Sequence, residues 1–291
     1  MHQAAPHRSG TLPAHLYALG AIALWATLAS LGVSLRHIPP FLLTGIGLLI
    51  GSLLALPFVL RDQRAWRIPA TTLALGVYGL FGFHLLLFIA LRHAPPVEAN
   101  LVNYLWPLFM VVLAPLLLVG VRLRGVHVVA ALLGFAGAAI AILGAGQNAA
   151  GQGGWSWGYL PALGSALIWA SYSLLSQRVA AFPTAAIGLF SLVSGLLSLL
   201  CHSMLEPSVL LSGHDWLLLA LMGLGPLGAA FFLWDKALKG GDARQIGILS
   251  YLTPLGSTAL LMLVSGRALS WSIGLAATMI LGAAVLGTRA R

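Results

Sequence analysis

The chain has 291 residues, of which 59% are hydrophobic and only 7% are charged, and its mean hydropathy is +0.97. Soluble globular domains carry roughly 25% charged residues, so this composition excludes an ordinary soluble enzyme or binding domain. A net charge of +9 does not indicate nucleic-acid binding either, because the basic residues stand singly between apolar runs and form no stripe. The composition predicts an all-α polytopic membrane protein.

Ten apolar runs follow one another, each near the roughly 20 residues that a helix needs to cross a bilayer. In chain order they are 14–36, 39–60, 69–91, 97–119, 125–145, 155–178, 184–205, 215–235, 243–265 and 269–288. The first run is interpreted as a retained helix, because it is too long and too late for the core of a signal peptide. The expected domains are a tail at 1–13, a five-helix unit at 14–147, a Gly-rich linker at 148–154, a second unit at 155–288 and a tail at 289–291.

Basic residues are distributed unequally between alternate loops, which predicts the orientation in the membrane. Twelve fall on the side of the N-terminus, namely Arg8, Arg61, Arg64, Arg67, Arg122, Arg124, Arg178, Lys236, Lys239, Arg244, Arg289 and Arg291. Three fall on the other side, namely Arg36, Arg92 and Arg267. Because cytoplasmic loops carry an excess of Lys and Arg, both termini are expected in the cytoplasm.

The two halves of the chain resemble each other. At an offset of 144 residues, the first run matches the sixth through Ala18–Gly20 with Ala162–Gly164, Trp25-Ala26 with Trp169-Ala170, and Pro39 with Pro183. At an offset of 147, the fourth run matches the ninth through Tyr104-Leu105 with Tyr251-Leu252 and Pro107-Leu108 with Pro254-Leu255. Each half then holds five helices, and because five is odd, the second half crosses the bilayer upside down. Such an inverted repeat is typical of transporters that work by alternating access.

The motif Asn103-Tyr104-Leu105-Trp106-Pro107-Leu108 is answered by Ser250-Tyr251-Leu252-Thr253-Pro254-Leu255 in the second half. With these paired motifs and ten predicted helices, the chain resembles the drug/metabolite transporter (DMT) superfamily, and within it the EamA-type branch and the bacterial YddG-type aromatic amino-acid exporters. The resemblance implies an inner-membrane exporter of aromatic or hydrophobic amino acids and related metabolites. It also implies a basket of helices around a central cavity, and no cofactor.

Polar side chains inside apolar runs are costly in lipid, so they are the first candidates for a substrate site. His84 lies in the middle of the third run, and Asn100 and Asn103 are three residues apart, so both can share one face of a helix. Each of the three has a structural alternative, as a hydrogen-bonded contact between helices. Aromatic walls are expected around an aromatic substrate, and the candidates are Trp25, Tyr78, Tyr104, Trp106, Trp169, Tyr172 and Tyr251.

The remaining tryptophans and several acidic residues are given structural interpretations. Aromatic belts at the membrane interfaces account for Trp66, Trp155, Trp157, Trp216, Trp234 and Trp271. Glu98 and Asp242 are interpreted as helix caps. Asp235 is expected to pair with Lys236 near the inner interface. Pro107 and Pro254 are expected to kink their helices at matching places, either as gating hinges or as static bends.

Other function classes are less consistent with the sequence. A polytopic membrane enzyme needs a catalytic cluster, and the six acidic residues are dispersed. A sugar-nucleotide carrier needs Lys or Arg inside its cavity to bind phosphates, whereas a broad drug or metabolite efflux carrier stays open. Because no carboxylate lies in the middle of a run, transport is either facilitative or coupled to protons through His84. The expected partners are a small-molecule substrate and lipid, with no metal, no nucleic acid and a monomer as the working assumption.

The topology generates a direct test at Gly151, in the predicted external linker. A reporter that is active only outside the cytoplasm should be active when it is fused there, because five helices precede that position. A fusion at Arg64 serves as the control and should be inactive with the same reporter. Activity of a cytoplasmic reporter at Gly151 would contradict the ten-helix topology.

Overall fold

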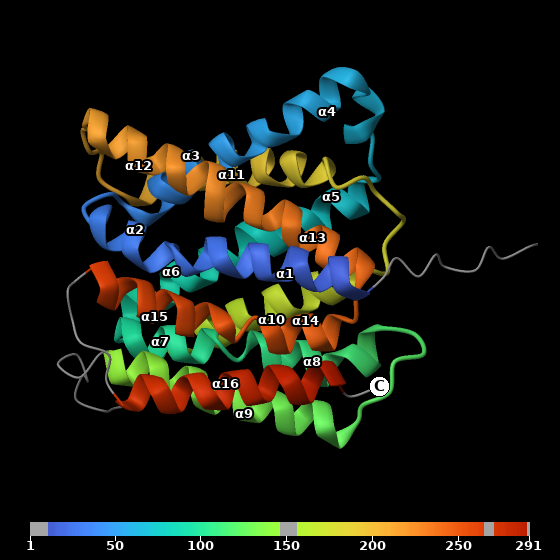
Figure 1. Cartoon of the computed structure of the whole chain (residues 1–291). Coiled ribbons are helices and arrows are strands. Elements are labelled where there is room, and N and C mark those ends of the chain that lie inside the picture. Colours follow the sequence, from blue (N-terminus) through green and yellow to red (C-terminus); the bar gives the residue numbers. More distant parts are fainter. Residues whose placement is uncertain (1–10, 146–155, 265–270, 290–291) are drawn as a thin grey trace, which may run out of the picture.

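The computed structural model describes residues 11–145, 156–264 and 271–289, and Figure 1 shows them as one bundle of long helices. Within these ranges every regular element is a helix and there is no β-strand. The all-α prediction is therefore confirmed. The predicted linker at 148–154, like Trp155 and Arg267, lies outside the described residues.

The first half of the chain forms the elements α1 (Thr11–Ala26), α2 (Leu28–Ser34), α3 (Pro40–Ser52), η1 (Leu53–Ala55), α4 (Leu56–Arg61), η2 (Gln63–Trp66), α5 (Ala70–Val77), η3 (Tyr78–Gly82), α6 (Phe83–His93), α7 (Pro96–Asn103), α8 (Trp106–Leu117) and α9 (Gly125–Ala145). The second half forms α10 (Tyr159–Leu175), α11 (Ala186–Leu205), α12 (Gly213–Leu224), η4 (Gly225–Ala229), α13 (Ala230–Gly240), α14 (Ala243–Leu249), α15 (Leu252–Val264) and α16 (Trp271–Arg289). Several of these elements join end to end into longer membrane spans.

Eight helices in the described residues are long and apolar enough to cross a membrane. Two of the ten predicted runs are not among these eight helices. The sixth corresponds to α10, which is apolar but has only 17 residues. The ninth is divided into α14 and α15 at Ser250 and Tyr251. Pro254 explains this break, because a proline has no N–H to donate to the carbonyl four residues earlier, that of Ser250.

The two halves are irregular at equivalent places. The fourth span breaks between α7 and α8 at Tyr104 and Leu105, as the ninth does between α14 and α15. The third and eighth spans each contain one π-helical turn, η3 and η4, and these begin 147 residues apart. The offset found in the sequence therefore relates the irregular turns as well as the identical residues.

Packing follows the same inverted pairing. The most extensive helix contacts are between α9 and α16 and between α3 and α11, each a helix with its own repeat equivalent. The pair α1–α13 likewise corresponds to the pair α10–α6. In Figure 1, α9 and α16 form one edge of the bundle, and α3, α11 and α12 lie at the opposite edge. The start of α1 and the end of α16 lie at the same end of the bundle, as an even number of crossings requires.

Glycine permits a close approach between the two halves at Gly51. A Cβ atom at Gly51 would lie 2.6 Å from the carbonyl oxygen of Leu227 and 2.9 Å from the Cα of Gly228. Both atoms belong to the backbone of η4 and cannot move independently of it. Small residues at such crossings let helix backbones pack directly on one another in lipid.

Gly51→Ala should therefore lower stability by about 1–3 kcal/mol, as overpacking of a tight contact does. Thermal unfolding of the purified protein in detergent measures the change. Gly274→Ala is the matched control, because nothing lies within 4 Å of a Cβ atom there, and alanine in a helix should leave stability unchanged or slightly higher. Equal melting temperatures for the two variants would contradict the close approach of α3 to η4.

Candidate functional site

A cavity of about 460 Å³ lies between the two halves of the chain. Its walls come from α1, α2, α3, α6, α7 and α8 of the first half, and from α10, the α12–η4–α13 span and α15 of the second. Most lining residues lie toward the end of the bundle that contains the α2–α3 turn (35–39) and the α6–α7 turn (94–95). We call this the cavity end, and the opposite end, which contains the α10–α11 connection (176–185), the closed end.

The cavity is mostly apolar, and its polar groups are neutral. They are Thr44, His84, Asn100, Asn103, Tyr104, Thr253 and Ser257. Among the described residues, no Asp, Glu, Lys or Arg lines the cavity. A concave, largely aromatic and aliphatic site with a few polar groups is the usual form of a small-molecule binding site.

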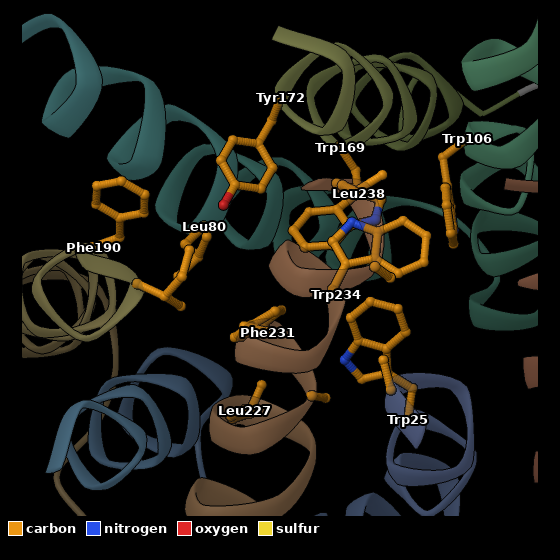
Figure 2. Close-up of a cluster of buried hydrophobic side chains, with 14 of the residues drawn as sticks. Trp25, Leu80, Trp106, Trp169, Tyr172, Phe190, Leu227, Phe231, Trp234 and Leu238 are labelled. Atoms are coloured by element: carbon orange, nitrogen blue, oxygen red, sulfur yellow. The ribbon is translucent and has the colours of Figure 1, made fainter. Parts of the chain in front are cut away.

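Trp25, Trp106, Trp169 and Trp234 form a buried tryptophan cluster (Figure 2), and all of them except Trp234 line the cavity. The Trp25 and Trp234 ring centroids are 5.2 Å apart, and those of Trp106 and Trp234 are 5.6 Å apart. Two indole N–H groups are satisfied, because Trp25 donates to the Pro226 carbonyl and Trp234 donates to the Ser173 hydroxyl, both at 3.1 Å. Buried tryptophans usually find a hydrogen-bond partner for the indole N–H, so these two side chains are held in fixed orientations.

Trp234 corrects one sequence prediction. It was assigned to the interfacial belt, but only 1% of its surface is exposed, and it stacks on Trp169 with an interplanar angle of 27°. The assignment failed because Trp234 lies near the end of the predicted run 215–235, whereas the observed span continues to Gly240. The residue is therefore deeper in the bundle than a boundary at 235 implies.

His84 lies on the wall formed by α6, immediately after the π-helical turn η3. Its Nδ1 atom is 2.6 Å from the carbonyl oxygen of Leu80, and the ring is 7% exposed. The Phe83 ring packs edge to face against the imidazole with centroids 5.1 Å apart, and the Phe88 ring centroid lies 5.9 Å from that of the imidazole. Its neighbours hold the ring in place, while its edge reaches the cavity.

Seven of the ten predicted substrate-binding residues line the cavity, namely Trp25, His84, Asn100, Asn103, Tyr104, Trp106 and Trp169. Asn103 is oriented by the hydroxyl of Ser165, which lies 2.8 Å from its Oδ1 atom. The structure does not bring the other three to the cavity wall. Tyr172 packs on Trp169 at 5.4 Å, Tyr251 is buried against Gly134, and Tyr78 is 41% exposed with its hydroxyl on Ser171.

Sequence reasoning missed two lining residues that the repeat offset identifies. Phe231 follows His84 by 147 residues, and Thr253 follows Trp106 by 147. The hydroxyl of Thr253 has no hydrogen-bond partner among the described residues. Trp25 and Trp169, 144 residues apart, form a third repeat-related pair, in contact at 5.8 Å. Both residues could have been found by adding the offset of 147 to the predicted site residues His84 and Trp106, even though the residues at the equivalent positions are not identical.

The two prolines lie just after the helix breaks. Pro107 is in the first turn of α8, and Pro254 is in the first turn of α15. The matching kinks expected from the sequence are thus full interruptions, because each proline leaves the carbonyl four residues earlier without its helical donor. Trp106 and Thr253, on the cavity wall, are the residues that directly precede the two prolines.

A buried carboxylate supports the wall at the cavity end. The Glu206 side chain, which is 0% exposed, pairs with Arg92 at 2.8 Å and with His202 at 3.0 Å. It also accepts hydrogen bonds from the backbone N–H groups of Phe41 and Leu42 at the start of α3, where the helix dipole favours a negative charge. Glu206 therefore joins α11 to α3 and α6. Phe41 in turn packs on Phe88 of the cavity wall at 5.3 Å.

At the closed end a buried carboxylate, that of Asp235, also forms an ion pair, but its partner lies on the same helix. Asp235 pairs with Lys239 at 2.6 Å and accepts from the Thr184 hydroxyl, so its predicted pairing with Lys236 is wrong. Lysine and aspartate four residues apart lie on one helix face, whereas neighbours do not. Lys239 also lies 4.0 Å from the centre of the Phe182 ring, and Lys236 faces Tyr17 instead.

The predicted caps agree with the structure in part. Asp242 caps α14 by accepting from the backbone N–H of Arg244 at 2.8 Å. Burial alone would raise the pKa of the Asp242 carboxyl, but its hydrogen bonds with Arg244 hold that pKa below its ordinary value. Glu98 lies in the first turn of α7, and its carboxylate accepts a hydrogen bond from the Tyr159 hydroxyl.

Glu206→Gln should destabilise the protein by about 1–3 kcal/mol, because it removes the charge that Arg92 and the start of α3 face. The melting temperature in detergent measures this loss. Asp62→Asn is the matched control, since Asp62 is the repeat equivalent of Glu206 at an offset of 144. Asp62 is exposed, and its carboxylate accepts a hydrogen bond from the backbone N–H of Arg64. We expect it to change stability by less than about 0.5 kcal/mol. Equal losses of stability in the two variants would contradict the burial of the Glu206 side chain.

Comparison with known proteins adds evidence independent of the geometry. The model of the EamA-like transporter family matches the chain twice, at residues 12–143 and 156–289. The aromatic amino acid exporter YddG of Ancylobacter novellus is 41% identical over 94% of this chain and 96% of its own length. The proteins of the same name from Salmonella typhimurium and Escherichia coli are 29% and 28% identical, over 92% and 94% of this chain and 94% and 96% of theirs. One protein of known crystal structure, 41% identical, superposes with a TM-score of 0.88 over 94% of this chain and 96% of its own.

Proposed function

Because the chain belongs to the EamA-like transporter family, we propose that it is a membrane exporter of aromatic amino acids, and that these bind in the cavity above the tryptophan cluster. The observation that carries the proposal is the composition of the cavity wall. Phe83, Trp169 and Phe231 offer aromatic faces, and His84 and Asn103 offer neutral hydrogen-bonding groups. Three relatives that match over more than nine tenths of this chain bear the name of aromatic amino acid exporters.

The mechanism that this geometry supports is alternating access around a fixed site. The tryptophan cluster closes the route toward the closed end, so a substrate in the cavity can exchange with one side of the membrane only. Repacking of the cluster would open the other side. The irregular segments, which are η4 and the breaks before α8 and α15, are the places where the spans can bend without losing regular helix. Pro107 and Pro254 are accordingly proposed as hinges.

The orientation follows from the basic residues. The loops and helix ends at the closed end hold Arg61, Arg122 and Arg178, as well as Lys239 and Arg244, whereas Arg36 and Arg92 lie at the cavity end. By the positive-inside rule the closed end faces the cytoplasm, in the inner membrane of a bacterium. The structure then corresponds to an outward-facing state, in which an exported substrate leaves through the cavity end. Both termini are cytoplasmic, and the two repeats extend over 14–147 and 155–288.

A sugar-nucleotide carrier is the runner-up within the same superfamily, and the cavity argues against it. Phosphate groups are bound by Arg and Lys through charge-assisted hydrogen bonds. Neither Lys nor Arg lines the described cavity, and Arg92, the nearest candidate in sequence to the lining residue Leu91, is held by Glu206. The site therefore favours a substrate without a phosphate.

Vesicles containing the purified protein should exchange labelled phenylalanine and tryptophan, and should ignore sugar nucleotides and glutamate, because the wall is apolar and uncharged. Trp169→Ala should reduce exchange at least tenfold, since Trp169 belongs to both the wall and the cluster. Trp271→Ala is the control, as Trp271 is 81% exposed on the outside of the bundle and should exchange as the unaltered protein does. Exchange of sugar nucleotides without aromatic amino acids would contradict the proposal.

A further inference from the structure

The hydrogen bond of His84 determines which ring nitrogen carries a proton. Nδ1 is 2.6 Å from the carbonyl oxygen of Leu80, and a carbonyl can only accept. Nδ1 must therefore be the donor, and in the neutral imidazole the other nitrogen, Nε2, then holds a lone pair and acts as an acceptor. The π-helical turn that contains Leu80 provides this carbonyl one turn before His84.

Nε2 is available to a ligand. It makes no hydrogen bond to any described residue, and it is not among the buried polar atoms that lack a partner. Since His84 lines the cavity while Nδ1 is turned toward its own helix, Nε2 is the polar atom that the ring offers to a substrate. An acceptor at this place suits a donor such as an ammonium group.

The rest of the wall treats the two charges of an amino acid unequally. An ammonium group is stabilised by aromatic faces through cation–π attraction, and Phe83, Trp169 and Phe231 all line the cavity. A carboxylate would need a cation or several strong donors to replace its hydration. Among the described lining residues there is no Lys or Arg, and only neutral groups such as Asn100 and Asn103 can donate to it.

On the basis of the proposed function, we propose that Nε2 of His84 accepts a hydrogen bond from the ammonium group of the substrate, and that the site also takes aromatic primary amines that have no carboxylate. The amine is then the charged group that the site requires, and the carboxylate is optional. Aromatic carboxylates without an amine are excluded, because their charge would meet the Nε2 lone pair and the negative faces of the rings.

Three ligands with one ring system separate these roles: L-tryptophan, tryptamine without the carboxylate, and indole-3-propionate without the amine. Equilibrium binding to the purified protein in detergent is the suitable measurement, since a neutral amine crosses vesicle membranes unaided. We expect tryptamine to bind within about tenfold of L-tryptophan. Indole-3-propionate should bind about ten- to hundredfold more weakly, because hydrogen bonds to charged groups contribute about that factor in affinity.

Variants assign the effect to Nε2. His84→Phe keeps a ring but removes the acceptor, and should weaken L-tryptophan and tryptamine by a similar factor, ten- to hundredfold. His84→Gln can place an amide oxygen near the Nε2 position and should restore most of the affinity for both. His93→Phe is the matched control, because His93 lies on the same helix and makes the same contact four residues back, Nδ1 to Ile89 at 2.8 Å, but lies outside the cavity.

The outcomes distinguish this inference from the proposed function. Binding of L-tryptophan with rejection of tryptamine, or binding of indole-3-propionate in preference to tryptamine, would overturn the inference and leave the exporter proposal intact. Binding of tryptamine without L-tryptophan would overturn the proposed substrate and keep the role of His84. Rejection of both would overturn both. If His84→Phe loses affinity only in parallel with its melting temperature, while His84→Gln does not recover, His84 has a structural role and the inference fails.

Discussion

A backbone that leaves its helical hydrogen bonds inside a bilayer must find other partners, because lipid supplies none. In this protein the break before α8 and the π-helical turn η4 contribute residues to the cavity wall, the break before α15 lies just before the lining residue Thr253, and the π-helical turn η3 leads into α6 with the lining residue His84. Two side-chain donors use carbonyls from the π-helical turns, since His84 bonds to Leu80 and Trp25 bonds to Pro226. The carbonyls of this irregular backbone thus orient His84 and Trp25, two residues of the cavity wall.

Inverted symmetry makes the scaffold nearly equivalent at both ends, while the site itself is asymmetric. Trp25 and Trp169 are equivalent and identical, but His84 corresponds to Phe231, and Trp106 corresponds to Thr253. The same holds for the ends of the bundle, where Glu206 bridges three helices and its equivalent, Asp62, caps only a short turn. We propose that shared packing permits two related conformations, while the unequal residues place His84 and Trp106 on the first-half side of the cavity and Phe231 and Thr253 on the second-half side.

Much of the fold was predictable because lipid imposes simple rules on sequence. Apolar length gave the spans, and the offsets of 144 and 147 gave the repeat. The site was partly predictable, because a buried polar residue such as His84 is costly unless it is used or paired. Phe231 is an ordinary apolar residue in sequence, and Glu206 lies in a loop, so burial and contacts alone distinguish them. Trp234 was misplaced because hydropathy does not define the end of a span to within a turn.

Accessibility of the cavity from one side tests the central claim, that aromatic substrates bind above a closed tryptophan cluster. Cys201 is the one cysteine of the chain, so Ser257→Cys on a Cys201→Ser background places a single thiol in the cavity wall. Its reaction with a membrane-impermeant maleimide should occur from the external side and should slow when L-tryptophan is added, whereas Ser203→Cys, exposed at the same end, should react without protection. Reaction of Ser257→Cys from the cytoplasmic side alone, or at a rate that saturating L-tryptophan does not change, would contradict the account.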